Sequence, residues 1–185
     1  MTDSFRLVVL DRDGVINEDS DAFIKSPDEW VAIPGSLEAI ARLCDAGYTV
    51  TVATNQSGIA RGYFDEQVLD AIHDKMLTGA RMAGGEIDFV AVCPHGPDDD
   101  CDCRKPRPGL LKQIADRYRA SLDDVPVVGD SLRDLQAGAS VGAKPMLVLT
   151  GKGEKTAQAL PDDLKSTPVY ADLASATDVL IGAGS

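Results

Sequence analysis

The sequence has few of the features that a membrane, secreted or nucleic-acid-binding protein needs. Its 185 residues contain no apolar run near the roughly 20 residues of a bilayer-spanning helix. Residues 1–6 carry no basic stretch that leads into an apolar core, as a secretory signal would. Only 18 Lys and Arg accompany 30 Asp and Glu, and the net charge of -12 disfavours binding to a phosphate backbone. We therefore expect a cytoplasmic protein that binds neither nucleic acid nor membrane.

The length and composition instead indicate one ordinary globular domain. With 44% hydrophobic and 26% charged residues, a chain of 185 residues can bury a core without disulfides or oligomerisation. We find no internal repeat, low-complexity stretch or interdomain linker in it. Residues 1–185 are thus expected to form a single domain, and the protein is expected to be a monomer.

Short apolar runs alternate with helical patterns along the chain. The predicted strands are 7–10, 49–53, 89–92, 125–128 and 146–149, and their continuous apolar character is typical of strands buried on both faces. The predicted helices are 36–46, 65–83, 108–119 and 132–141, with Asp65 as an N-cap and Gly47 as a terminating glycine. Cys44 and His73 lie on or beside apolar helical stripes and are expected in the core. This order predicts an α/β fold of three layers with a central parallel sheet.

Ligands of such sheets bind at the carboxyl ends of the strands, and the first predicted strand ends in two acids. Asp11 and Asp13 are two positions apart on extended backbone, so they project to the same side, and Gly14 permits the turn that follows. Packed carboxylates repel each other unless a cation lies between them, and magnesium prefers oxygen ligands. Two solvated acids in a turn are the alternative interpretation.

Three further strand ends carry groups that suit a phosphate and a metal. Residues 54–58, Thr-Asn-Gln-Ser-Gly, offer short polar side chains and backbone N–H groups to phosphoryl oxygens. Residues 104–109 supply three cations ahead of a helix whose positive end attracts anions. Residues 129–134 contain Asp130 and Asp134, one of which could equally cap the next helix. Polar turns and a solvated basic loop are the alternatives for each segment alone.

A zinc site is expected in the loop after the third strand. Cys93-x-His95 is followed, after five intervening residues, by Cys101-x-Cys103. Three thiolates and one imidazole form a closed tetrahedral ligand set, which indicates a structural rather than a catalytic zinc. Disulfides are the alternative, but a cytoplasmic protein keeps its thiols reduced and three loop cysteines cannot all pair. Because Arg104 follows directly, zinc would fix the backbone that aims the next cations at the site.

Together the four strand ends resemble the four motifs of the haloacid dehalogenase (HAD) superfamily. The resemblance covers nearly the whole chain and rests on Asp11-x-Asp13-Gly14, Thr54-Asn55, Lys105 and Gly129-Asp130-x-x-x-Asp134. It implies a Rossmann-like fold and a magnesium-dependent phosphatase, a phosphoric monoester hydrolase. By this resemblance Asp11 is the nucleophile that forms an aspartyl-phosphate and also binds magnesium. Asp13 protonates the leaving alcohol, then takes a proton from the hydrolytic water, and it binds magnesium through its backbone carbonyl.

The resemblance implies supporting roles at the other strand ends. Thr54 and the backbone of Asn55 would hold phosphoryl oxygens, and Lys105 would balance charge between the nucleophile and the phosphate. Asp130 would complete the magnesium site, and Asp134 would orient a metal-bound water rather than bind the ion. Gln56, Ser57 and Ser131 are further candidates for contacts with the substrate.

Members of this superfamily often carry a cap domain after the first or second motif. Here 41 positions separate Asp13 from Thr54 (54 minus 13), and 51 separate Thr54 from Lys105 (105 minus 54). Predicted helices, strands and the zinc loop fill these intervals, so we expect a capless protein. Substrate selection then falls to the loop after the first motif, to the zinc loop, and to Arg104 with Arg107.

A capless domain whose zinc loop runs into Arg-Lys-Pro is similar to the D-glycero-D-manno-heptose 1,7-bisphosphate 7-phosphatases of this superfamily. The resemblance extends over residues 11–17, 54–58 and 93–109. It implies hydrolysis of the C7 phosphate to give heptose 1-phosphate, in the biosynthesis of the ADP- or GDP-activated heptose of lipopolysaccharide core. It also implies substrate recognition by Arg104 and sugar contacts from Asp19, Ser20, Asp21 and Ala22.

Two other functions are consistent with the same motifs. Histidinol-phosphate phosphatase resembles this chain in the motifs and the zinc loop, but its substrate is cationic at the far end, whereas a heptose bisphosphate is anionic. Arg104 and Arg107 favour the anion, while Asp21 and residues 98–100 weigh against it. The non-enzymatic alternative is a zinc-stabilised phosphate-binding module, which the presence of both acids of the first motif disfavours.

Overall fold

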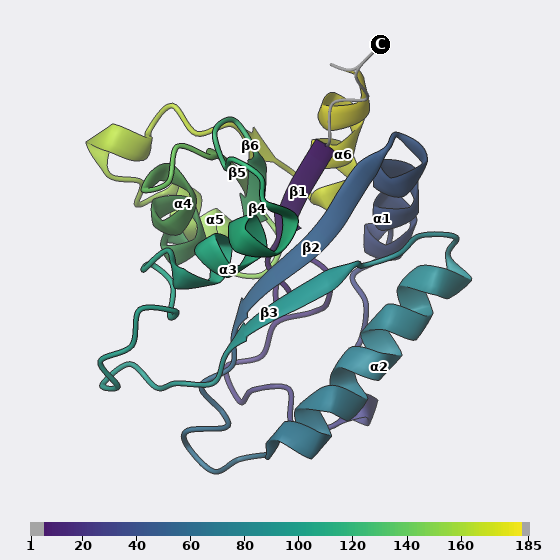
Figure 1. Ribbon diagram of the computed structural model, residues 1–185, viewed down its shortest axis with the longest axis vertical. Helices are drawn as coiled ribbons and strands as arrows, with labels where there is room; N and C mark the ends of the chain where they lie inside the picture. Colours follow the sequence, from purple (N-terminus) through teal and green to yellow (C-terminus); the bar gives the residue numbers. More distant parts are fainter. Residues whose placement is uncertain (1–5, 183–185) are drawn as a thin grey trace.

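Six parallel strands form one sheet in the computed structural model of the protein, which describes residues 6–182 (Figure 1). The strands lie in the order β3-β2-β1-β4-β5-β6. Their bounds are β1 Arg6–Leu10, β2 Tyr48–Asn55, β3 Phe89–Cys93, β4 Pro126–Gly129, β5 Lys144–Val148 and β6 Val169–Tyr170. This is the strand order of a doubly wound Rossmann-like sheet, in which the direction of winding reverses between β1 and β4.

Helices cover both faces of the sheet, as the continuous apolar strands predict. In β1, Val8 and Leu10 face one core, and Leu7 and Val9 face the other. The first face carries α1 (Ser36–Asp45), α2 (Glu66–Met82) and α6 (Leu173–Gly182). The second carries α3 (Gly109–Tyr118) and α4 (Leu132–Ala139), and shorter helices are α5 (Gly153–Ala157), η1 (Pro27–Glu29) and η2 (Asp162–Leu164). The three layers confirm the predicted fold class.

The predicted helix ends agree with the structure. The Asp65 carboxylate accepts a hydrogen bond from the Val68 backbone N–H at 2.9 Å, and α2 begins at the next residue. This bond satisfies one of the unpaired N–H groups of the first turn. Gly47 has φ 83° directly after α1, a conformation that glycine adopts without a steric penalty.

Two features of the fold differ from the prediction. Strand β2 continues through Asn55, so Thr54 and Asn55 lie in the strand rather than in the turn that follows it. Strand β6 and helix α6 were not predicted. Helix α6 packs beside α1, where Arg42 pairs with Asp178, and β6 has only two residues. A strand of two residues carries no detectable period, so only the tertiary structure reveals it.

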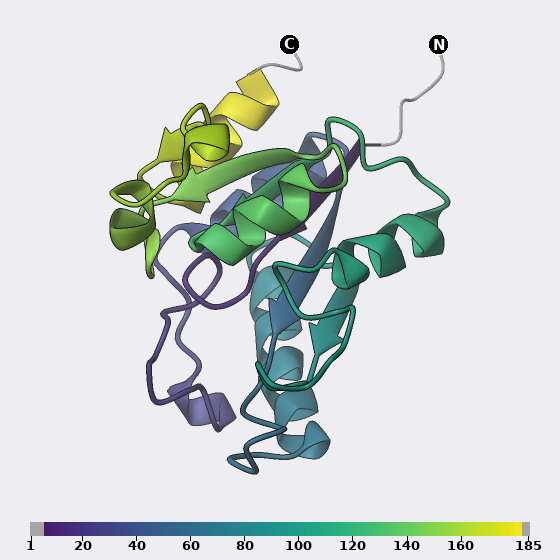
Figure 2. The same ribbon diagram turned by 90° about the vertical axis from the view of Figure 1, so that its left-hand side faces the viewer.

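The carboxyl ends of the strands carry loops and no cap domain within residues 6–182. A loop with the single short helix η1 joins β1 to α1, and the connection from β2 to β3 contains α2 alone. Figure 2 shows the loops after β1, β2 and β3 gathered at the same end of the sheet. Among the helices that the structure describes, none combines the length and the apolar content needed to cross a membrane.

Candidate functional site

A cavity of about 160 Å³ lies at the carboxyl ends of β1, β2 and β4. It brings together most of the residues predicted to bind substrate or magnesium, from segments that are far apart in the sequence. The lining residues are Asp11, Asp13, Asp19, Ser20, Asp21, Phe23, Ile24, Asn55, Gln56, Ser57, Arg104, Lys105, Asp130, Ser131, Arg133, Asp134 and Lys152. Of the predicted substrate contacts, Thr54 and Ala22 are outside this lining, and Thr54 is fully buried.

The strand order explains why the cavity forms at this position. Asp11 follows β1 and Asp130 follows β4, the neighbouring strands between which the winding reverses. The helices that follow these two strands pack on opposite faces of the sheet, which leaves a crevice outside the strand ends. The backbone N–H of Asp11 donates to the Val128 carbonyl at 2.9 Å and so continues the pairing of the two strands into the site.

Three carboxylates meet at this crevice. Asp11, Asp130 and Asp134 each offer an oxygen, and these atoms lie within 4.8 Å of one another. Gly14 has φ 83°, and a Cβ there would lie 2.0 Å from Oδ2 of Asp130. Any other residue at position 14 would therefore displace that carboxylate, so glycine is needed for close approach as well as for the turn.

Lys105 lies between two of these carboxylates. Its Nζ is 3.0 Å from Oδ1 of Asp11 and 2.7 Å from Oδ1 of Asp134, and it donates to the Ala53 carbonyl at 2.6 Å. Burial disfavours a charged lysine, but the Asp11 and Asp134 carboxylates outweigh it and raise the Lys105 pKa. Lys105 is therefore a permanent cation that touches the predicted nucleophile.

Asp134 has both carboxylate oxygens occupied by protein groups. While Oδ1 pairs with Lys105, Oδ2 accepts from the Ser131 backbone N–H at 3.0 Å and from the Ser131 hydroxyl at 2.7 Å. Together with Ser131 it forms the capping box at the start of α4, the alternative role considered for one of these acids. Burial opposes its charge, yet the Lys105 ammonium and these hydrogen bonds lower the Asp134 pKa. Asp134 is therefore a fixed anion beside Asp11 and Asp130.

The two remaining carboxylates are suited to hold a cation. Burial is the main cause that raises the pKa of Asp11 well above its ordinary value and the pKa of Asp130 to about 7. The charge of Asp134 is the second cause for both groups. A divalent cation at this position would relieve the repulsion and keep both groups ionised. Oxygen donors in this number suit magnesium, which leaves further positions to water and substrate.

Asp13 is held by three side chains that converge on its carboxylate. Arg12 donates to it from Nε and Nη2 at 2.9 to 3.1 Å, while the amides of Asn17 and Gln56 donate at 2.9 Å each. Burial opposes ionisation, but Arg12 and these hydrogen bonds lower the Asp13 pKa. Arg12 and Asn17 were not identified as site residues from the sequence. Their places inside and next to the Asp11-x-Asp13 motif are the only sequence signal that could have suggested them.

Gln56 and Asn55 have structural contacts in addition to lining the cavity. Nε2 of Gln56 also donates to the Thr54 hydroxyl oxygen at 2.8 Å, which leaves the hydroxyl hydrogen of Thr54 free to donate. The side chain of Asn55 donates to the Lys105 carbonyl at 3.1 Å and accepts from the Lys105 N–H at 3.0 Å. Both residues therefore link β2 to other residues that line the cavity, Asp13 and Lys105.

His73 reaches the site through Arg12. Its side chain is buried in α2, as predicted, and its Nε2 lies 3.2 Å from Nη1 of Arg12. Burial, and then the charge of Arg12, lowers the His73 pKa to about 4. An arginine can only donate, so Nε2 accepts and the imidazole is neutral with its proton on Nδ1.

The depressed His73 pKa makes stability depend on pH. The unfolded chain, with an ordinary value near 6.5, binds the proton more readily than the folded one, so stability falls as pH decreases from 6.5 to about 4. Between pH 7 and pH 4 this residue should cost about 3 kcal/mol of unfolding free energy. Urea unfolding of the wild type and of His73→Gln across this range should show the wild type losing that much more than the variant. Parallel pH profiles for the two proteins would contradict the expectation.

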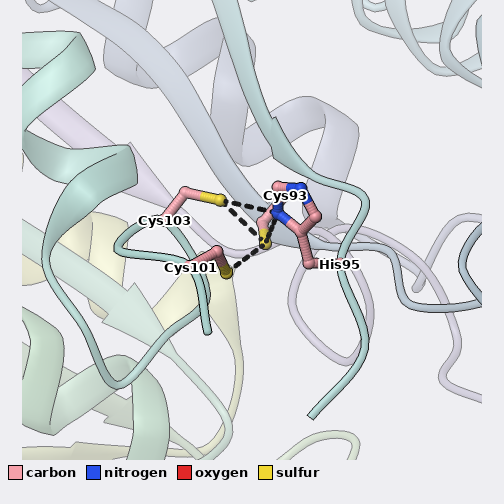
Figure 3. Close-up of side chains that lie close together, drawn as sticks. All are labelled: Cys93, His95, Cys101 and Cys103. Atoms are coloured by element: carbon pink, nitrogen blue, oxygen red, sulfur yellow. Dashed lines mark hydrogen bonds between the residues drawn. The ribbon is translucent and has the colours of Figure 1, made fainter. Parts of the chain in front are cut away.

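The predicted zinc ligands converge at the end of β3, which supplies Cys93, and in the loop after it (Figure 3). Their ligand atoms lie within 4.8 Å of one another: Sγ of Cys93 is 3.0 Å from Cys103, 3.8 Å from Cys101 and 3.6 Å from Nδ1 of His95. Ligands of one tetrahedral zinc are about 3.4–3.8 Å apart, which matches most of this spacing. All four cysteines of the chain, with Cys44 among them, are unpaired thiols, so the set fits zinc and not a disulfide.

The cations after the zinc loop have different orientations. Arg104 lines the cavity and donates to the His95 carbonyl at 3.1 Å. Arg107 is outside the cavity lining and donates instead to Asp100 at 2.9 Å and to the Cys101 carbonyl at 2.6 Å. Arg107 is thus held by the zinc loop itself, and its assignment to substrate selection stays a prediction. Arg133 and Lys152 line the cavity in its place and had no motif to indicate them.

The loop predicted to contact the sugar lies at the entrance of the cavity. Asp19 pairs with Lys152 at 3.1 Å, and its carboxylate also accepts from the Ser20 N–H at 2.9 Å. Ser20 and Asp21 line the cavity, and the lining continues through Phe23 and Ile24, whereas the predicted residue Ala22 is not part of it. This wall of the cavity is therefore formed by residues 19–21, 23 and 24.

Comparison with known proteins agrees with this geometry. A family model described as "HAD-hyrolase-like" matches residues 102–176. A D-glycero-beta-D-manno-heptose-1,7-bisphosphate 7-phosphatase from Bordetella bronchiseptica is 58% identical over 178 residues, 95% of this chain and 98% of the relative. A protein of the same name from Pseudomonas aeruginosa is 53% identical over 95% of this chain and 97% of its own length.

The fold has an equally similar solved structure. A crystal structure of D,D-heptose 1,7-bisphosphate phosphatase from B. bronchiseptica, complexed with magnesium and phosphate, matches with a TM-score of 0.92. It is 57% identical, and the match covers 97% of this chain and 99% of that one. The chain therefore belongs to the D-glycero-beta-D-manno-heptose-1,7-bisphosphate 7-phosphatase family of the HAD superfamily.

Proposed function

We propose that the protein is a magnesium-dependent phosphatase that removes the C7 phosphate of D-glycero-D-manno-heptose 1,7-bisphosphate through an aspartyl-phosphate on Asp11. The observation that carries the proposal is the contact of Lys105 with Asp11 beside the Asp11, Asp130 and Asp134 cluster. A nucleophilic carboxylate, a fixed cation and a metal-binding acid pair are the parts that a covalent phosphoryl transfer needs. Homology to enzymes of this name, over nearly the whole chain, supports the substrate.

The first step divides a difficult displacement into two easier ones. An oxygen of the Asp11 carboxylate attacks phosphorus, and the bond from phosphorus to the C7 oxygen breaks. Asp13 donates a proton to that leaving oxygen. In the second step a water gives its proton to Asp13 and attacks phosphorus, the bond to Asp11 breaks, and phosphate leaves. Asp11 is regenerated, and Asp13 releases the proton from water to solvent as phosphate leaves, which returns it to the carboxylate form.

Before substrate binds, the contacts of Asp13 keep it in the carboxylate form that its role as a base requires. Its pKa is lowered by Arg12 and by its hydrogen bonds, against the effect of burial, so it is a carboxylate before substrate arrives. A phosphate entering beside Asp13 adds negative charge and raises its pKa again, which favours uptake of the proton that the leaving oxygen needs. Substrate binding would therefore prepare Asp13 as the acid.

The phosphate is proposed to be held by groups on β2 and beyond it. Thr54 has a free hydroxyl hydrogen because Gln56 donates to its oxygen, and Asn55 and Ser57 line the cavity. Lys105 neutralises charge between Asp11 and the transferred group. Preorganised donors of this kind need no rearrangement during the reaction, which makes them effective in stabilising the transition state.

Magnesium is proposed to bind the carboxylates of Asp11 and Asp130 and the backbone carbonyl of Asp13. When bound there, it supplies positive charge to the phosphoryl oxygens. Asp134, held by Lys105 and Ser131, would orient a metal-bound water. The raised pKa of Asp11 and of Asp130, caused by burial and then by neighbouring acids, supports the need for this cation.

Zinc is proposed as a structural ion held by Cys93, His95, Cys101 and Cys103. Burial raises the pKa of Cys93 to about 12, and only a bound metal would keep that thiol deprotonated at neutral pH. Because Arg104 and Lys105 follow directly in the chain, the ion would hold the backbone from which both side chains reach the cavity.

Loss of zinc should weaken activity without removing the catalytic groups. Cys103→Ser is expected to lower the zinc content well below one ion per chain and to reduce kcat roughly 10-fold, the size of effect seen when groups that support a site are lost. Elemental analysis and steady-state kinetics measure both quantities. Cys44→Ser, a change in a thiol outside the cluster, is the control and should keep zinc and activity. Near-stoichiometric zinc in Cys103→Ser would contradict the assignment.

The substrate is tested by comparing kcat/KM with magnesium for both anomers of heptose 1,7-bisphosphate, fructose 1,6-bisphosphate and histidinol phosphate. The heptose bisphosphate should be preferred by about 100-fold or more over histidinol phosphate, because Arg104, Arg133 and Lys152 line the cavity and favour an anionic far end. Asp11→Asn serves as the blank. Faster turnover of histidinol phosphate would reverse the assignment.

The remaining assignments concern the setting in which the enzyme works. A single domain over residues 1–185 is proposed, because one sheet unites the elements of residues 6–182. A monomer is proposed, because a chain of 185 residues can bury a core without oligomerisation. A cytoplasmic location is proposed, because reduced thiols are needed at the zinc loop. The product, a heptose 1-phosphate, would serve the biosynthesis of activated heptose for lipopolysaccharide.

A further inference from the structure

Arg12 is the largest of the fully buried side chains among residues 6–182. A guanidinium cannot lose its proton in a protein, so its burial requires partners that accept its hydrogen bonds. The structure supplies Asp13 on one side and the imidazole of His73 on the other. Neither Arg12 nor His73 lines the cavity, so a role for either in the reaction must act through another residue.

The contacts of Arg12 fix the plane of its guanidinium. Nε and Nη2 donate to the Asp13 carboxylate at 2.9 to 3.1 Å, and Nη1 donates to Nε2 of His73 at 3.2 Å. The group is planar and its nitrogens form a rigid fork, so an anchor at Nη1 determines where the other two nitrogens meet a carboxylate. His73 provides this anchor from the middle of α2, a helix outside the four motifs.

We propose that His73 and Arg12 are positioning residues that hold the Asp13 carboxylate at the angle needed for proton exchange with the leaving oxygen and the hydrolytic water. The inference rests on the proposed function, because it assigns that proton exchange to Asp13. Asn17 and Gln56 each donate only one hydrogen bond to the Asp13 carboxylate, at 2.9 Å, whereas Arg12 donates hydrogen bonds to both of its oxygens. Of these partners, Arg12 therefore has the greatest control over the rotation of the Asp13 carboxylate.

The geometry distinguishes this role from simple satisfaction of a buried arginine. Proton transfer depends on heavy-atom distances of about 2.6–3.2 Å and on alignment, and a misplacement near 1 Å costs on the order of 100-fold in rate. A histidine that only completes the core would affect folding and not this alignment. A histidine that positions Asp13 would affect those steps in which Asp13 moves a proton.

The test compares two substrates that differ in their need for an acid. A sugar phosphate releases a strongly basic alkoxide that needs a proton, whereas p-nitrophenyl phosphate releases a weakly basic phenolate that does not. Single-turnover rates of leaving-group release are measured for the wild type, His73→Leu and His73→Gln, with magnesium and zinc present. Met76→Leu is the matched control, since Met76 is fully buried one turn away on α2 and has about the volume of leucine.

His73→Leu should reduce the rate with the sugar phosphate roughly 10-fold, with KM unchanged, and should leave p-nitrophenyl phosphate within about 2-fold of the wild type. His73→Gln retains an acceptor for Nη1 and should recover most of the loss. Met76→Leu should affect neither substrate. Equal losses on the two substrates, or no loss in a folded His73→Leu protein, would refute the positioning role.

A second measurement covers the case in which the proposed function itself fails. If the wild type hydrolyses neither substrate, the phosphatase assignment is wrong, and a crystal structure of His73→Leu still tests the geometry. The inference expects the Arg12 guanidinium and the Asp13 carboxylate to be rotated or split between two conformations in that variant. Both groups unmoved from their wild-type positions would overturn it.

Discussion

Asp11→Asn is expected to reduce kcat at least about 10,000-fold with every phosphate ester that the enzyme accepts. The variant keeps the shape of the side chain and an oxygen for the Lys105 and backbone Arg12 contacts, at 3.0 and 2.8 Å in the wild type. It lacks the second carboxylate oxygen and the charge, so it can neither attack phosphorus nor bind a cation strongly. The protein should therefore fold and yet form no aspartyl-phosphate.

Two measurements check this expectation. Steady-state kinetics give the loss in kcat, and acid quenching after mixing with radiolabelled substrate detects the covalent intermediate. Asp70→Asn, which changes an exposed acid on α2, is the control and should label and turn over like the wild type. Activity above about 1% of wild type in an Asp11→Asn sample that mass spectrometry shows to be free of deamidation would exclude Asp11 as the nucleophile.

Lys105→Met is expected to produce the second largest effect, a loss of roughly 1,000-fold in kcat. The lysine is 4% exposed and separates the Asp11 and Asp134 carboxylates, so the variant leaves two buried anions without their shared cation. Removing one partner of a buried charge cluster also destabilises a fold by about 3–5 kcal/mol. The pKa of Asp11 is already raised, mainly by burial and secondly by the charge of Asp134. Protonation of Asp11 in the variant would offset part of that cost and would further suppress attack on phosphorus.

The same variant separates an electrostatic role from a structural one. Urea unfolding measures the change in stability. Kinetics without urea, at a temperature well below the thermal unfolding transition, measure the change in rate. Lys112→Met, at an exposed position on α3, removes an equal charge and should alter neither quantity appreciably. A kcat for Lys105→Met within about 10-fold of the wild type would mean that Lys105 contributes little to transition-state stabilisation.

Much of the fold could be predicted because its determinants are local. The apolar runs that became β1 to β5, the Asp65 cap and the glycine after α1 each act within a few residues. Strand β6 and helix α6 could not be predicted in the same way. Strand β6 has only two residues, and α6 is apolar on most sides, so neither has the periodic pattern that separates a helix from a strand.

In the candidate site too, some features have local determinants that the sequence reveals, and others depend on tertiary packing. Polar residues at the ends of parallel strands converge whatever the side chains between them, so Asp11, Asp13, Lys105 and Asp130 could be expected at one edge of the sheet. The four thiol and imidazole groups of the zinc loop are close in sequence and need only one turn of chain to meet. Which oxygen each cation contacts depends on packing between distant segments and was not predictable.

The sequence by itself determined the alternation of strands and helices, the polar strand ends and the four candidate zinc ligands, because each follows from residue type and spacing. Only the tertiary structure decided that Arg107 is held by the zinc loop, that Arg133 and Lys152 line the cavity, and that Arg12 is buried against His73. Those outcomes depend on competition among neighbours for each charged group. That competition is settled when helix α2, the zinc loop and the strand ends pack together. It is strictest for Arg12, because burial removes the water that could otherwise accept its hydrogen bonds.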